Sequence, residues 1–145
     1  MNKAVRLEPL ADYAGKVETE AARRLGVSAR AVAAKEKEVE QLRSYLAEYR
    51  RRAELADSST DSLRWQNTRA FVTKLSDVVA ARETELAAVV EGYRLEAERW
   101  RDSYRRAKSL DKIVADGARQ ASLDVAKREQ RELDERTLRQ MLDAG

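Results

Sequence analysis

The chain has 145 residues, of which 38% are charged and 43% hydrophobic, and its formal net charge is +3 at pH 7. The hydrophobic residues are largely Ala, Leu and Val, and there is a single proline, which is the composition of a coiled coil. Without histidine or cysteine, the chain lacks the usual base at neutral pH, a common metal ligand and the thiolate nucleophile, and it cannot form disulfides. We therefore expect an all-α, non-enzymatic protein with no catalytic residues, no cofactor and no metal.

The first predicted helix covers about residues 5–57. Its apolar residues recur with steps of three and four, which is the a/d pattern of a coiled coil. This stripe consists of Leu7, Leu10, Ala14, Val17, Ala21, Leu25, Ser28, Val32, Lys35, Val39, Leu42, Leu46, Tyr49 and Ala53. Two consecutive steps of four, from Val17 through Ala21 to Leu25, break the seven-residue repeat and predict a locally relaxed supercoil.

A polar break at about residues 58–62 predicts a turn, because Ser, Thr and Asp there can cap the following helix. The second predicted helix covers about residues 63–142. Its apolar stripe consists of Leu63, Phe71, Leu75, Val78, Leu86, Val89, Tyr93, Trp100, Ala107, Leu110 and Val114.

The two stripes come into register when the chain is folded back near residue 60. Facing positions then have residue numbers that add up to about 120, as for Leu10 with Leu110 and Tyr49 with Phe71. We therefore predict an antiparallel two-helix coiled-coil hairpin that forms a single structural unit over residues 1–145. The alternative is one continuous rod that pairs in parallel with a second copy.

The second helix is predicted to be longer than the first, which leaves an overhanging C-terminal helix that is unpaired beyond about residue 115. Past Val114 the stripe weakens at Gly117, and charged residues surround the helix on nearly all sides. Such a helix is either marginal alone or ordered by a partner.

Aromatic residues are few, and several are predicted to gather near the turn. Tyr45, Tyr49, Trp65 and Phe71 lie there, and Leu75 follows Phe71 at helical spacing. These side chains either fill the seam or also form an exposed patch of the kind that anchors a protein interface.

Two basic clusters, Arg50–Arg52 and the residues from Arg99 to Lys112, are interleaved with acids or spread around the helix. They are either solvated charges beside the seam or a docking site for an acidic protein surface. Nucleic-acid binding would require a stripe of basic residues without interspersed acids. No apolar run is long enough to span a bilayer, and the first residues lack the apolar region of a signal peptide. We expect a soluble, cytoplasmic protein.

Four segments together resemble the FliJ family of flagellar type III export proteins. They are Arg6–Leu10, Gln66–Leu75, the run from Trp100 through Arg105–Lys112, and Glu129–Glu135. The order and spacing of these segments match across essentially the whole chain.

The resemblance implies a cytoplasmic component of the flagellar export apparatus that is peripherally associated with the inner membrane at the flagellar base. By similarity, it would dock into the hexameric export ATPase ring, promote ring assembly, and couple the ring to the cytoplasmic domain of the export gate. Export chaperones are further implied partners, and contact with the membrane would be only through the gate complex. The resemblance assigns gate contacts to Tyr45, Tyr49, Phe71 and Leu75, and ring contacts to Leu7, Leu10, Leu110, Arg119, Arg128 and Glu132. The equivalent stalk of a virulence-type injectisome and a generic structural or adaptor coiled coil are the alternatives.

Overall fold

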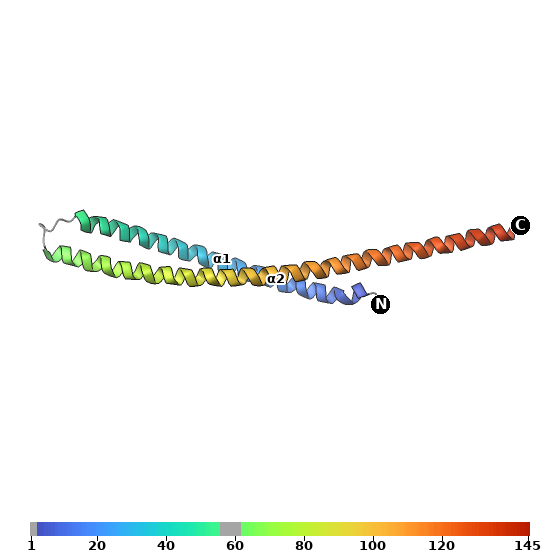
Figure 1. Ribbon diagram of the computed structural model, residues 1–145, viewed down its shortest axis with the longest axis horizontal. Helices are drawn as coiled ribbons and strands as arrows, with labels where there is room; N and C mark the ends of the chain where they lie inside the picture. Colours follow the sequence, from blue (N-terminus) through green and yellow to red (C-terminus); the bar gives the residue numbers. More distant parts are fainter. Residues whose placement is uncertain (1–2, 56–61) are drawn as a thin grey trace. The chain divides into compact units, whose positions relative to one another are not determined.

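The computed structural model describes residues 3–55 and 62–145. Two helices, α1 (Lys3–Leu55) and α2 (Ser62–Asp143), account for nearly all of these residues, and no strand occurs among them (Figure 1). The all-α prediction is confirmed, and the helix bounds differ from the expected ones by at most two residues. The predicted turn at about 58–62 lies outside the described residues except for Ser62, which begins α2.

The chain divides into two compact units. The central unit is Ala21–Trp100, and the terminal unit combines Met1–Glu20 with Arg101–Gly145. Each unit therefore brings a segment of α1 together with a segment of α2.

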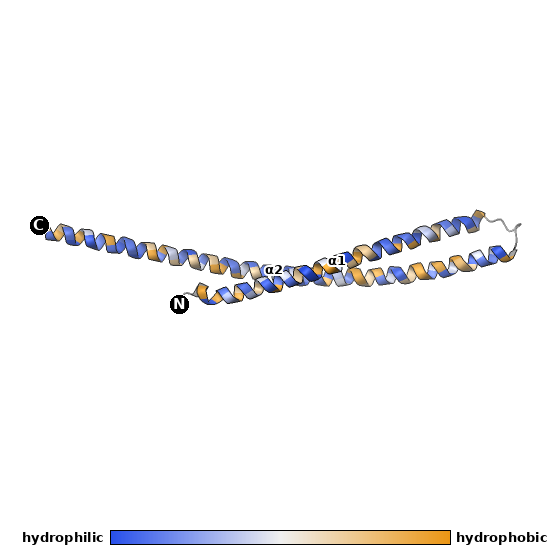
Figure 2. Cartoon of the chain, turned by 180° about the vertical axis from the view of Figure 1, so that it is seen from behind, coloured by the Kyte–Doolittle hydropathy of each residue, from blue (hydrophilic) through white to orange (hydrophobic). Residues whose placement is uncertain are grey.

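In the central unit, α1 and α2 run antiparallel and side by side, as Figures 1 and 2 both show. Four pairs of residues contact each other across the two helices: Lys35 with Glu85, Glu38 with Arg82, Arg43 with Glu83, and Tyr49 with Phe71. The residue numbers in these pairs add up to between 120 and 126. The register predicted from the folded-back stripes is thus correct in this unit.

The α1 seam of the central unit follows the predicted stripe from Ala21 to Ala53, with every position buried or half-buried. Val39 is only 1% exposed and Leu46 is 6% exposed, so these two residues form the centre of the contact. Figure 2 shows the corresponding alternation of hydrophobic and hydrophilic residues along both helices.

The α2 seam of the central unit differs from the predicted stripe. Val79 is 5% exposed, whereas the predicted Val78 is 40% exposed, and Leu63 and Phe71 are also exposed. The buried or half-buried seam positions are instead Trp65, Thr68, Val72, Leu75, Val79, Arg82, Leu86, Val89, Glu96 and Trp100. These positions follow a seven-residue repeat except at Tyr93, which is 38% exposed while its neighbour Gly92 is half-buried. The prediction left this repeat because it avoided polar Thr68 and Arg82.

The same kind of error occurs in the terminal unit. Ala11 and Ala14 are 6% and 5% exposed, whereas the predicted Leu10 is 53% exposed and Val17 is 37% exposed. With Ala11 in place of Leu10 and half-buried Glu18 in place of Val17, buried positions recur every seven residues without interruption. The predicted break between Val17 and Leu25 is therefore wrong, and the pattern gives no reason for a relaxed supercoil there.

The core is thin, because most of the buried residues are small. Among the described residues, the buried hydrophobic ones are Ala11, Ala14, Val39, Leu46, Val79, Ala97 and Ala107. Each alanine removes little apolar surface from water, so the pairing depends on many weak layers in series. On α2, Val114, Gly117 and Ala121 are still half-buried, and every side chain from Ser122 to Gly145 is exposed.

Candidate functional site

Tyr45, Tyr49, Phe71 and Leu75, which we call the aromatic cluster, occupy the central unit near the ends of α1 and α2 that adjoin residues 56–61. The rings of Tyr49 and Phe71 meet edge to face, with centroids 4.7 Å apart and an interplanar angle of 61°. Tyr49 and Leu75 are half-buried seam residues, whereas Tyr45 is 56% exposed and Phe71 is 46% exposed. The sequence left open whether these residues fill the seam or form an exposed patch. The cluster does both, since two members fill the seam and two face solvent beside it.

Arginine side chains stack on two aromatic rings at this end of the central unit, one in the cluster and one outside it. The Arg52 guanidinium lies 5.2 Å from the centre of the Tyr49 ring and donates a hydrogen bond to Glu48 over 2.7 Å. The Arg69 guanidinium lies 4.8 Å from the centre of the Trp65 ring. Stacked arginine and aromatic groups are enriched at the centres of protein interfaces. Sequence reasoning missed both pairs, although an arginine three or four residues after an aromatic residue was a usable signal.

The terminal unit exposes a second apolar surface. Leu10, Tyr13, Val17 and Ile113, which we call the terminal apolar face, are between 37% and 67% exposed. Leu10, Tyr13 and Val17 share one side of α1 by their spacing of three and four residues. Leu10, Val17 and Ile113 each precede a seam position, and in an antiparallel pair such positions line the same edge.

The residues assigned to the ATPase ring are only partly brought together. Leu7 and Leu110 are half-buried seam residues of the terminal unit, and Leu10 belongs to its exposed face. Arg119, Arg128 and Glu132 are exposed on α2, and Arg119 pairs with Asp116 of its own helix over 3.0 Å. Tyr13, Val17 and Ile113 were missing from the sequence assignment because two of them were not in the predicted stripe and Val17 was taken for a buried layer.

The exposed end of α2 is held by short-range polar pairs. Gln120 donates a hydrogen bond to Asp124, and Gln130 donates one to Asp134, each four residues ahead on the helix. Such pairs support a helix that has little apolar packing. The same stretch carries exposed apolar side chains at Leu123, Val125, Leu133, Leu138, Met141 and Leu142.

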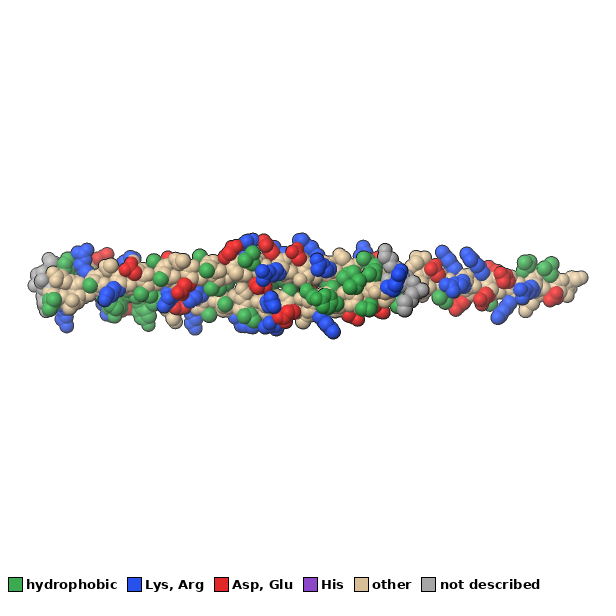
Figure 3. Space-filling view, turned by 90° about the horizontal axis from the view of Figure 1, so that it is seen from below, with side chains coloured by type: hydrophobic (Ala, Val, Ile, Leu, Met, Phe, Trp, Pro, Cys, Tyr) green, Lys and Arg blue, Asp and Glu red, His purple; other side chains and the backbone are tan. Residues whose placement is uncertain are grey.

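One arginine of each basic cluster pairs with an acid on the same helix, and Arg94, which lies between the clusters, does so too. Arg99 pairs with Glu96, and Arg52 pairs with Glu48. Hydrogen bonds from Arg94 lower the pKa of the Glu91 carboxyl, and the same pairing raises the pKa of Arg94 above its ordinary value. Figure 3 shows basic and acidic side chains interspersed over the visible face, as in a salt-bridged helix surface.

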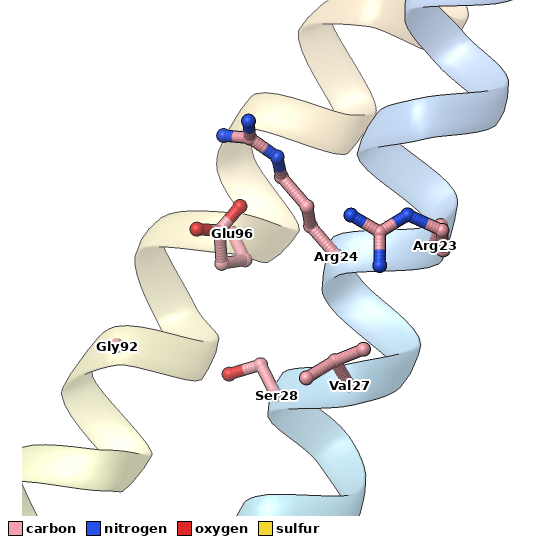
Figure 4. Close-up of a pocket in the computed structure, with 6 residues that line it drawn as sticks. All are labelled: Arg23, Arg24, Val27, Ser28, Gly92 and Glu96. Carbon is pink, nitrogen blue, oxygen red and sulfur yellow. The ribbon is translucent and has the colours of Figure 1, made fainter.

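A hollow of about 280 Å³ lies between the helices of the central unit. It is lined by Arg23, Arg24, Val27, Ser28, Gly92 and Glu96. In Figure 4, Arg24 extends from α1 toward α2 on the side of Glu96, and Gly92 leaves space where a side chain would fill the seam. Ligand pockets are mostly apolar, and this hollow is lined largely by charged and small residues.

No group of three or more acidic side chains among the described residues is arranged to hold a metal ion. Within the same residues, neither α1 nor α2 contains a stretch long and apolar enough to cross a membrane. The aromatic cluster and the terminal apolar face are both exposed apolar surfaces of the described chain.

A comparison with protein-family models matched residues 2–145 to the family described as Flagellar FliJ protein. The chain belongs to the FliJ family. This confirms the resemblance seen in the sequence over essentially the whole chain and makes the protein one related to flagellar export. Neither the comparison with curated proteins nor the one with solved structures gave a match.

Proposed function

We propose that this FliJ family member is a non-enzymatic, cytoplasmic component of the flagellar type III export apparatus. It docks into the hexameric export ATPase ring, promotes assembly of the ring, and couples the ring to the cytoplasmic domain of the export gate. The observation that carries this proposal is the family match over residues 2–145, together with two exposed apolar surfaces in separate units. Export chaperones are further partners, and the protein reaches the inner membrane at the flagellar base through the gate complex.

The aromatic cluster is the proposed gate contact. Tyr45 and Phe71 are exposed, and the edge-to-face contact with Tyr49 holds the Phe71 ring in place before a partner arrives. A preformed aromatic anchor loses little conformational entropy on binding, and this favours affinity. Tyr49 and Leu75 support the exposed pair from the seam.

The ring contact is proposed to combine the terminal apolar face with Leu7, Leu110, Arg119, Arg128 and Glu132. We propose that α2 overhangs α1 beyond about residue 115 and that the exposed side chains after Ala121 contact the ring. Exposed apolar residues between alternating charges suit an interface in which apolar anchors give affinity and charges give orientation.

The coupling requires that the protein binds different states of the ring and the gate with different affinity. A ligand shifts an equilibrium only by its differential affinity for the two states, and the effect on the two sites is reciprocal. A hairpin that contacts the ring through one unit and the gate through the other couples them when its affinity for each partner depends on that partner's state.

The proposal is tested by co-purification with a hexameric flagellar export ATPase. We expect the unaltered chain to be retained, and Leu10→Ser with Tyr13→Ser to reduce retention at unchanged helicity. Leu95→Ser is the matched control, because Leu95 is 42% exposed in the central unit outside both surfaces. Retention of the double variant at the level of the control, or no retention of the unaltered chain, contradicts the proposal.

A further inference from the structure

Four charged side chains form a closed ring across the two helices of the central unit. Lys35 Nζ lies 3.1 Å from Glu38 Oε2 and 3.0 Å from Glu85 Oε2. Arg82 Nε lies 3.0 Å from Glu38 Oε1, and Arg82 Nη1 lies 2.9 Å from Glu85 Oε1. Each cation therefore contacts both carboxylates, and one of its two contacts is on the opposite helix. We call these four residues the charged layer.

The two cations occupy seam positions, where a coiled coil normally carries apolar residues. Lys35 follows Ser28 and precedes Leu42 in the seven-residue repeat of α1, and Arg82 follows Leu75 and precedes Val89 in that of α2. Their side chains are 24% and 38% exposed, so the layer is partly shielded from water. Hydrogen bonds with Glu85 and then Glu38 raise the pKa of Lys35, and the hydrogen bond from Lys35 lowers the pKa of Glu85.

The apolar seam alone does not define how the helices pair. The same spacing of three and four residues repeats along both helices, so a shift by one heptad still places one apolar stripe against the other. The charged layer does not survive that shift, because Lys35 would then face Val78 or Gly92 in place of Glu85. In a parallel pair with a second copy, each seam cation would face its own counterpart, and like charges in contact are unfavourable.

We infer that the charged layer of Lys35, Glu38, Arg82 and Glu85 fixes the direction and the register in which α1 and α2 pair. Only in the observed antiparallel register does each of the four charges contact an opposite charge on the other helix. A polar layer in an apolar seam is a known means of setting coiled-coil register. This inference is independent of the proposed export function.

The test exchanges charges without changing composition. The variant Lys35→Glu with Glu38→Lys keeps opposite charges three residues apart on α1 but makes both cross-helix contacts like-charged. Adding Arg82→Glu with Glu85→Arg restores opposite charges across the helices. The control Glu91→Arg with Arg94→Glu exchanges an exposed pair within α2.

The readout is the distance between two spin labels, which is unambiguous because the chain contains no cysteine. Cysteines replacing Ala47 and Ala80 are suitable, since both residues are exposed and line the same hollow between α1 and α2. A slip of one heptad moves the labels by about 10 Å along the helix axis. Sedimentation of the same samples reports association with a second copy.

We expect one short distance for the unaltered chain, the control and the fourfold variant. The α1 exchange should add a second population displaced by about 10 Å or a species of doubled mass. A single unshifted distance and a monomeric mass for the α1 exchange would overturn the inference. If the α1 exchange does not fold, the fourfold variant decides, because failure to recover the short distance would also overturn it.

Discussion

Tyr49 of α1 and Phe71 of α2 meet edge to face with their ring centroids 4.7 Å apart. The contact joins a half-buried seam residue to one that is 46% exposed, so it belongs both to the packing of the hairpin and to its surface. We therefore expect removal of Phe71 to lower the folding stability modestly. It should lower the affinity for a partner that covers the ring much more.

For Phe71→Ala with Leu75→Ala, we expect binding to the export gate to fall by about thirtyfold or more, as for other hot-spot residues. Phe71→Ala alone should cost only about 1 kcal/mol of folding stability, since the Phe71 ring is 46% exposed. Gate affinity by calorimetry and helicity by circular dichroism measure the two effects. The control is Val90→Ala, which alters an exposed residue of α2 outside the cluster. Normal gate binding by the double variant, or equal losses in the control, would remove the cluster from the gate interface.

The seam of α2 is tested by two adjacent valines. Val79→Ala should lower the free energy of unfolding by about 2 kcal/mol, because two methyl groups leave a buried site. Val78→Ala should change it by less than about 0.5 kcal/mol, because Val78 is an exposed residue. Urea unfolding followed by circular dichroism distinguishes the two variants. The opposite order would restore the predicted stripe, which placed Val78 in the seam.

The charged layer predicts how stability depends on pH. The pKa of Glu85 lies below its ordinary value of 4.5 in the folded chain, so its contribution is present above that value and is lost as the pH falls through the folded-state pKa. The pKa of Lys35 lies above its ordinary value of 10.5, so its contribution is present below that value and is lost as the pH rises through the folded-state pKa.

We therefore expect the melting temperature to be level between about pH 5 and pH 10 and to fall on both sides. Glu85→Gln should flatten the acid side, and Glu129→Gln, on the exposed stretch of α2, should leave it unchanged. An acid side that is identical in the unaltered chain and in Glu85→Gln would show that Glu85 contributes nothing to it.

Antiparallel pairing within one molecule is tested by labels at positions 10 and 110. In a hairpin these positions lie across the pair, and the label separation should be on the order of 10–20 Å. In a continuous rod they would be about 150 Å apart within one chain. Diluting the labelled protein with an unlabelled excess keeps the short distance only if it is intramolecular. Loss of the short distance on dilution would favour pairing with a second copy.

Much of this architecture could be predicted from the sequence. The repeat of three and four residues and the polar break are local patterns, and the register follows from the distance of each stripe to the break. The misplaced residues share one cause, which is that large apolar side chains were preferred to the strict repeat. Leu10 was preferred to Ala11, and Val78 was reached by counting on from Phe71 and Leu75, although the repeat selects Ala11 and Val79. Arg82 was passed over because it is charged. Glu38 and Glu85 compensate its charge in the seam, and no local pattern reveals the contact with Glu38 on the other helix.

The candidate surfaces were predictable to a similar extent. The proximity of Tyr49 and Phe71 follows from the register, and the structure confirms it. The terminal apolar face was not foreseen, because exposure of Val17 and Ile113 depends on which side of each helix the seam takes. Stacking of Arg69 on Trp65 depends on side-chain conformation, which spacing alone does not define.

The central claim is that this chain acts on the export ATPase through its terminal unit and the exposed end of α2. The most direct measurement is the ATP turnover of a flagellar export ATPase, with its hexamer fraction, in the presence of the full chain or of residues 1–114. We predict that the full chain raises both quantities and that the truncated chain, with its helicity per residue retained, raises neither. Equal stimulation by the two chains, or none by the full chain, would contradict this account.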